Sequence, residues 1–104
     1  MNEGNYSDAH GFPFTYNALG IGKLIGMPVA GTMTAVWWET LQDPTLYFGI
    51  PEMGVKDLNG QYLENKELKP DVLMPNLPED MTNGIDSQLK AAVDELLKEL
   101  DSKK

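Results

Sequence analysis

The sequence contains no cysteine and no arginine, and His10 is its single histidine. Without cysteine there is no disulfide framework, thiol nucleophile or cysteine-based metal site, and one histidine excludes a metal site with several histidine ligands. We therefore expect neither a metal nor another cofactor. All eight basic residues are lysine, against sixteen Asp and Glu, so the formal charge is −8. Because such a field repels phosphates, and arginine is the residue best suited to bind them, nucleic acid and anionic membranes are not expected partners.

Long apolar runs are also missing, and none approaches the roughly 18 residues of a membrane span. What is present fits a small globular unit. The chain has 104 residues, of which 41% are hydrophobic, enough for one core in a chain of this length. No linker, internal repeat or low-complexity segment divides it. We expect one α+β unit that covers residues 1–104.

The first helix is expected from about Ser7 to Leu19. Ser7 and Asp8 suit the beginning of a helix, and Gly20 and Gly22 suit its end.

The clearest helix is expected near the C-terminus, with Asp86 or Ser87 as its N-terminal cap. Two acid–lysine pairs, Asp94–Lys98 and Glu99–Lys103, have the four-residue spacing that favours ion pairs. Its apolar positions form one stripe: Ile85, Leu89, Ala92, Val93, Leu96, Leu97 and Leu100.

Two hairpins are expected between the helices, because aromatic and β-branched stretches alternate there with turn residues. Residues 34–40 and 45–50 form the first. Residues 54–58 and 61–65 form the second, around Asn59-Gly60, the strongest two-residue turn signal.

Two further stretches are expected to be single strands. Residues 23–29 read as a short buried strand, and residues 70–75 as an edge strand because prolines flank it. In the first hairpin, alternation turns one indole of Trp37-Trp38 into the core and leaves the other over a groove or a partner. Lys23 is expected at the surface, with no feature that depresses its pKa.

Three residues could carry chemistry. Ser7 lies at a helix start, where free backbone N–H groups can stabilise an oxyanion, although a helix cap is the simpler interpretation. His10 is three residues further on and could act as a base, but a surface histidine is the commoner case. Glu64 could orient a base, or it could be a solvent-facing glutamate at a strand end.

The order of several motifs resembles a known family, over about Asn2 to Leu100. The nucleophile region of the tail-specific (C-terminal-processing) serine peptidases is similar to residues 2–9 (NEGNYSDA), 19–28 (LGIGKLIGMP) and 30–32 (AGT). The tricorn-type branch is similar to residues 60–65 (GQYLEN), 68–72 (LKPDV), 78–80 (PED) and 84–89 (GIDSQL).

The resemblance implies roles for three positions. Ser7 matches the nucleophile, the Asp8 backbone N–H matches one oxyanion donor, and Glu64 matches the acidic residue that supports a Ser-His pair. In the processing branch the base is a lysine after a glycine in the turn beyond the nucleophile helix. Here that turn is Gly31-Thr32, so the tricorn-type branch, with a histidine base, is favoured. His10 does not stand at that base's position.

In this family the base, its serine partner and a second oxyanion glycine lie upstream of the nucleophile. The resemblance therefore implies that residues 1–104 are the C-terminal part of a catalytic domain with a crotonase-like or ClpP-like ββα-spiral fold. The expected partners are the missing N-terminal half and a peptide or protein substrate. The expected function is hydrolysis of peptide bonds through an acyl-enzyme on Ser7, with the chain inactive when isolated.

Two alternatives stay open. The chain could be a non-catalytic module on the same scaffold that binds a peptide or ligand in an aromatic groove. It could also be a self-contained interaction domain whose exposed strand edges and aromatic patch pair with a partner, including a second copy of itself.

Overall fold

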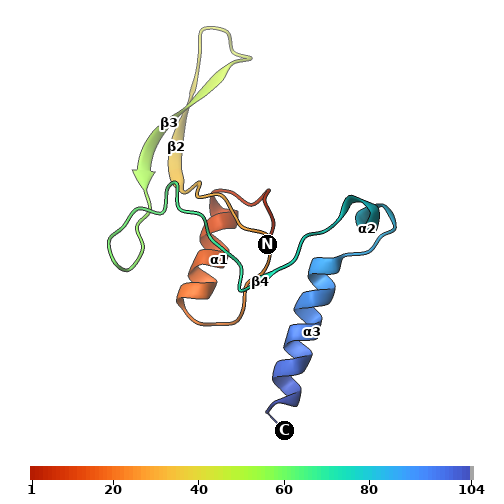
Figure 1. The fold of residues 1–104 in the computed structure, drawn as a ribbon. Coiled ribbons are helices and arrows are strands. Elements are labelled where there is room, and N and C mark those ends of the chain that lie inside the picture. Colours follow the sequence, from red (N-terminus) through yellow and green to blue (C-terminus); the bar gives the residue numbers. More distant parts are fainter. Residues whose placement is uncertain (104) are drawn as a thin grey trace.

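Helices and strands are mixed along the chain, as expected, in a computed structural model that describes residues 1–103 (Figure 1). The elements in chain order are α1 (Asp8–Ala18), β1 (Ile25–Gly26), β2 (Thr34–Thr40), β3 (Tyr47–Gly54), β4 (Val72–Leu73), α2 (Pro78–Thr82) and α3 (Ser87–Asp101). The first and last helices confirm the sequence expectations. The hairpin β2–β3 is also confirmed, but its second strand runs over Tyr47–Gly54 and not 45–50, and the strand expected over 70–75 is only the two residues of β4. The single-turn helix α2, which begins at a proline suited to a first helical position, was not anticipated.

A small core lies beside the parallel pair β1–β4, whose register joins Ile25 to Val72 and Gly26 to Leu73. The strand expected over residues 23–29 is only two residues long. Gly26 has a φ of 133° and Pro28 follows, so the chain bends away from a regular ladder. Leu24, Val29 and Leu68 form the buried core cluster, with Met1, Phe14 and Tyr16 packed against it, and Leu63 is buried outside this cluster.

The hairpin β2–β3 extends away from the rest of the chain as an arm (Figure 1). Its strands pair in antiparallel register, with an irregularity between Ala35 and Val36. The expectation of one inward indole is wrong, because Trp37 is 59% exposed and Trp38 is 61% exposed. The physical reason is that no other element of residues 1–103 covers either face of the arm.

The second hairpin is reduced to a single bridge between Lys56 and Tyr62. Two backbone hydrogen bonds flank this bridge, from the Leu63 N–H to the Val55 carbonyl at 2.9 Å and from the Asp57 N–H to the Gln61 carbonyl at 2.8 Å. The turn is held further by Asp57 Oδ1, which accepts hydrogen bonds from the Asn59 and Gln61 backbone N–H groups. Gly60 has the positive φ of 78° that its turn requires.

The helix α3 begins as expected, because the Asp86 side chain accepts a hydrogen bond from the Leu89 N–H at 2.9 Å. Its ion pairs differ from the expected ones: they are Lys90–Asp94 at 2.7 Å and Lys98–Glu95 at 2.6 Å. Most of its apolar stripe is exposed: Ile85, Leu89, Val93, Leu96, Leu97 and Leu100.

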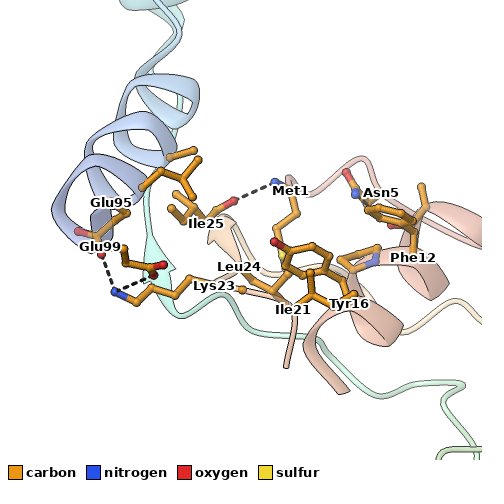
Figure 2. Close-up of a pocket in the computed structure, with 15 residues that line it drawn as sticks. Met1, Asn5, Phe12, Tyr16, Ile21, Lys23, Leu24, Ile25, Glu95 and Glu99 are labelled. Carbon is orange, nitrogen blue, oxygen red and sulfur yellow. Dashed lines mark hydrogen bonds and ion pairs between the residues drawn. The ribbon is translucent and has the colours of Figure 1, made fainter. Parts of the chain in front are cut away.

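A long-range ion pair joins the segment just before β1 to α3 (Figure 2). Lys23 Nζ donates to Glu95 Oε2 at 2.7 Å. This contact raises the pKa of Lys23 and, together with Lys98, lowers the pKa of Glu95 to about 2. Lys23 is thus the surface lysine that the sequence indicates, with a defined partner.

The chain is extended. Its radius of gyration is 17.6 Å and its principal extents are 61 × 40 × 17 Å, whereas a compact domain of this length has a radius of about 13 Å. The arm and the α3 stripe therefore expose far more apolar surface than a closed domain does. Within residues 1–103, no helix is long and apolar enough to cross a membrane.

Candidate active site

Ser7 occupies a sharp turn into α1, with φ 52° and ψ −124°. Its N–H donates to the Thr32 carbonyl at 2.9 Å, and its own carbonyl accepts the His10 and Gly11 N–H groups at 2.8 and 3.0 Å. A residue with a side chain pays about 1–3 kcal/mol for such backbone strain. A strained serine at the start of a helix is the geometry of a nucleophile elbow, which exposes the hydroxyl.

Ser7 stands at the N-cap position of α1, as expected for the start of the helix, but its side chain does not cap the helix. Capping residues have extended backbone angles and bond a helical N–H through the side chain, whereas Ser7 has a positive φ and no side-chain cap bond. The residue is exposed, and no hydrogen bond within residues 1–103 engages its hydroxyl. Its Oγ is therefore accessible to a reacting group.

The Asp8 backbone N–H, the first of α1, is a free donor. The next N–H, of Ala9, donates to the Tyr6 carbonyl at 3.0 Å, but no hydrogen bond in the described part of the chain uses that of Asp8. Free N–H groups at a helix start carry partial positive charge and attract anions. An oxyanion formed beside Ser7 would find this donor unoccupied.

Glu64 holds Met33 and Thr34, at the start of β2, through hydrogen bonds. Its Oε2 accepts three hydrogen bonds, from Met33 N at 2.7 Å, Thr34 N at 2.8 Å and Thr34 Oγ1 at 2.9 Å. These bonds lower the pKa of Glu64, and the bond from the Met33 N–H has the largest effect. The carboxylate is therefore ionised at neutral pH. The alternative of an unengaged, solvent-facing glutamate is therefore wrong.

His10 is buried, with 1% of its surface exposed, so the expectation of a surface histidine is wrong. Burial lowers its pKa, against the opposing effects of the Glu64 charge and a hydrogen bond with the Thr32 backbone. The imidazole is thus neutral at neutral pH. Its ring meets Phe14 edge-on at 6.4 Å, and its Nδ1 has no partner within residues 1–103. No hydrogen bond joins it to the Ser7 hydroxyl.

Residues 31–34 connect Ser7, His10 and Glu64, through the Ser7 backbone and the other two side chains, and sequence reasoning did not foresee this link. Thr32 receives the Ser7 N–H and bonds the His10 imidazole, while Met33 and Thr34 bond Glu64. The Gly31 carbonyl accepts the Asn65 N–H at 2.6 Å. The Gly31-Thr32 turn was the only feature of the sequence that pointed to this segment. Its carbonyl acceptors could not be predicted, because every residue type has the same backbone carbonyl.

The strain at Ser7 gives a testable expectation for stability. Glycine adopts a positive φ freely, so Ser7→Gly should raise the free energy of unfolding by about 1 kcal/mol, the relieved strain less the entropy cost of glycine. Urea denaturation of both purified chains measures the difference. The control is Asn65→Gly, since Asn65 also has a positive φ, 60°, but asparagine tolerates it better. A loss of stability at Ser7 would contradict the strain assignment.

The family model for peptidase family S41 matches residues 1–74. The tricorn protease of Thermoplasma acidophilum is 31% identical over 106 aligned residues, which cover 95% of this chain and 9% of that protein. The crystal structure of the tricorn protease superposes with a TM-score of 0.81 and 30% identity, over 95% of this chain and 10% of that one. The chain thus spans about a tenth of these relatives, and it belongs to peptidase family S41.

Proposed function

We propose that this chain contributes the nucleophile and its acidic support to a serine peptidase whose general base lies on polypeptide outside residues 1–104. The observation that carries the proposal is the turn at Ser7, which is strained, exposes an unbonded hydroxyl and stands beside the free Asp8 N–H. Family membership supports the reaction class.

The proposed reaction is acyl transfer from a peptide to Ser7 and then to water. The Ser7 Oγ attacks the peptide carbonyl carbon while the external histidine accepts the hydroxyl proton. The Asp8 N–H donates to the oxyanion of the tetrahedral intermediate. Collapse breaks the C–N bond, and the histidine returns the proton to the departing amine. Water, deprotonated by the same histidine, then attacks the ester and releases the carboxylic acid and Ser7.

Glu64 is proposed to position the Ser7 turn through backbone contacts and not to contact the substrate. Its carboxylate orders Met33 and Thr34, next to the Thr32 carbonyl that receives the Ser7 N–H. Its second oxygen takes no hydrogen bond within residues 1–103, so it stays open to a donor that the external part would bring. The ionised state is the one that accepts hydrogen bonds at both oxygens.

His10 is a poor candidate for the base. It is buried, its imidazole bonds the Thr32 backbone, and burial lowers its pKa. Lysine is also disfavoured, since Gly31 is followed by Thr32 where a processing-type base would stand. An external histidine is the remaining choice for proton transfer at neutral pH.

The external part is also proposed to complete the fold, as a crotonase-like or ClpP-like spiral. The arm β2–β3 has two free strand edges and exposed indoles, and α3 leaves its stripe open. An isolated two-stranded hairpin is at best marginally stable in water. Burial of the arm and of the α3 stripe against the remainder of the domain would stabilise the hairpin.

A non-catalytic binding module is the second candidate, favoured by the exposed aromatics of the arm. A binding module explains the exposed aromatic side chains of the arm. It does not explain why Ser7 has a strained backbone while its hydroxyl has no hydrogen bond within residues 1–103. Strained residues of this kind cluster at functional sites, and an exposed serine hydroxyl at such a site favours the nucleophile.

Hydrolysis of a fluorogenic peptide library tests the proposal. The purified 104-residue chain should show no serine-dependent hydrolysis, because it lacks the base. The same chain, expressed with the coding region that leads into Met1, should hydrolyse peptides. Serine-dependent activity of the isolated chain would contradict the external base, and an inactive extended polypeptide would favour the binding module.

A further inference from the structure

His10 contacts the Ser7 turn from both sides of the strained residue. Its backbone N–H donates to the Ser7 carbonyl at 2.8 Å, and the Ser7 N–H donates to the Thr32 carbonyl at 2.9 Å. The His10 imidazole in turn forms a hydrogen bond with the Thr32 backbone. Ser7, Thr32 and His10 are therefore joined in a closed ring. Two of its three bonds are made by the backbone, and the His10 side chain makes the third.

The imidazole is the donor in this third bond, and the Thr32 carbonyl is the acceptor. The bond raises the pKa of His10, as a hydrogen bond does when the ring donates it and the charged form is favoured. Nδ1 has no hydrogen-bond partner within residues 1–103, so the donor is the N–H at Nε2. A carbonyl oxygen has two lone pairs. One Thr32 oxygen thus receives both the Ser7 N–H and the His10 ring.

The surroundings of His10 keep its imidazole neutral. The residue is 1% exposed, and burial has the largest effect on its pKa, which it lowers. The charged group that faces it is the Glu64 carboxylate, whose opposing effect is smaller. A neutral imidazole has one N–H and one acceptor nitrogen. The N–H is used on Thr32, and Nδ1 remains as a buried acceptor without a donor.

Packing alone does not account for a histidine at this position. The ring meets Phe14 edge-on, which an apolar side chain of similar volume could also do. A buried polar atom without a partner costs stability, whereas an apolar side chain carries no such cost. The Nδ1 of His10 is an atom of this kind. The histidine is therefore better explained by the carbonyl that its N–H holds than by the space that its ring fills.

We propose that His10 is a positioning residue for the nucleophile: its ring N–H fixes the Thr32 carbonyl and so holds the Ser7 turn in the orientation that reacts. This inference rests on the proposed function, in that Ser7 is the nucleophile. A positive φ is unfavourable for serine, so the turn persists only where its neighbours hold it. No hydrogen bond joins the His10 ring to the Ser7 hydroxyl within residues 1–103, so His10 acts through Thr32 and takes no proton from Ser7.

Glu64 and His10 hold neighbouring parts of the same segment. Glu64 accepts the two backbone N–H groups that follow Thr32 in the chain, whereas the His10 ring donates to the Thr32 carbonyl. Of the two, the His10 contact lies on the residue that accepts the Ser7 N–H. Loss of the His10 contact is therefore expected to loosen Ser7 while the Glu64 bonds keep the rest of the segment in place.

Substitution of His10 by methionine and by glutamine tests this role. The two side chains have the same length, but only glutamine offers an N–H in place of the one at Nε2. Hydrogen exchange of the Ser7 amide, followed by NMR on the isolated chain, reports on its bond to Thr32. We expect His10→Met to speed this exchange by about tenfold, and His10→Gln by less than about threefold. The Val29 amide, which donates to the Leu68 carbonyl at 2.9 Å, is the control and should exchange equally in both variants and the unsubstituted chain.

The same two variants of the extended polypeptide separate positioning from substrate binding. A displaced nucleophile lowers kcat, because a shift of about 1 Å can reduce the rate by about a hundredfold, while the peptide binds as before. We expect His10→Met to lower kcat by about tenfold or more, with KM within about twofold of the unsubstituted polypeptide. His10→Gln should keep kcat within about threefold, because its amide N–H replaces that of the ring.

Equal exchange of the Ser7 amide in His10→Met and the unsubstituted chain would overturn the proposal. Equal effects of methionine and glutamine would also overturn it, since the N–H would then not matter. Faster exchange at Ser7 and Val29 together would make His10 a residue of general stability, and a raised KM at unchanged kcat would make it a binding residue. Exchange in the isolated chain does not depend on hydrolysis, so failure of this role and failure of the proposed function are distinguishable.

Discussion

Alanine at Gly31 is expected to destabilise the chain by about 3 kcal/mol or more, the range of large steric effects. A Cβ at this position would lie 2.1 Å from the Lys66 nitrogen and 2.5 Å from its carbonyl oxygen. Because both atoms belong to the backbone, no side-chain rotation relieves the clash. Residues 31–34 would have to separate from residues 64–66. The Asn65–Gly31 hydrogen bond and the Glu64 bonds to Met33 and Thr34 would be lost with them.

Urea denaturation of Gly31→Ala measures this effect, with Gly20→Ala as the matched control. Gly20 has a φ of 63° and no atom within 4 Å of its added Cβ, so its substitution carries only backbone strain, about 1 kcal/mol. We expect the Gly31 variant to lose clearly more stability than the Gly20 variant. Similar losses at both positions would contradict the close packing of residues 31 and 66.

Alanine at Ser7 is expected to reduce peptide hydrolysis by the extended polypeptide by about 10³-fold or more, since the acyl-enzyme cannot form. The fold should be unaffected by the loss of the hydroxyl, which bonds nothing within residues 1–103. The measurement is kcat/KM on a cleaved peptide, with a urea midpoint for both proteins. A catalytic defect without a stability defect is the signature of a nucleophile.

The control for this experiment is Ser102→Ala. The Ser102 hydroxyl donates to the Glu99 carbonyl at the end of α3, so hydrolysis should be retained. Retention of activity by Ser7→Ala would contradict the role of Ser7. A loss of activity matched by a loss of stability would assign Ser7 a structural role instead.

Local sequence patterns were enough to predict the helices and strands that form because of residues close together in the sequence. The Asp86 cap, the stripe of α3 and the aromatic stretches of the arm all depend on residues close in sequence. The burial of those elements was not predictable in the same way. Alternation implies that one face of a strand is covered, but Trp37 and Trp38 are both exposed because no other element of residues 1–103 covers the arm.

The candidate site was predictable only in part, and for a related reason. Ser7 and Glu64 were singled out by their residue types and by their place in a familiar order of motifs. Their connection runs through the backbone of Thr32, Met33 and Thr34, and backbone acceptors and donors are the same for every residue. The burial of His10 was missed because it depends on packing around Phe14 and residues 31–34.

Covalent labelling of Ser7 tests the central claim most directly. A fluorophosphonate reacts with a serine hydroxyl whose proton a base removes, and peptide mass spectrometry locates the phosphonyl group. With the upstream coding region present, we predict one label per polypeptide on the peptide that contains Ser7, and none on the isolated 104-residue chain. Labelling of Ser87 or Ser102 instead, or an unlabelled Ser7 in the extended polypeptide, would contradict the account.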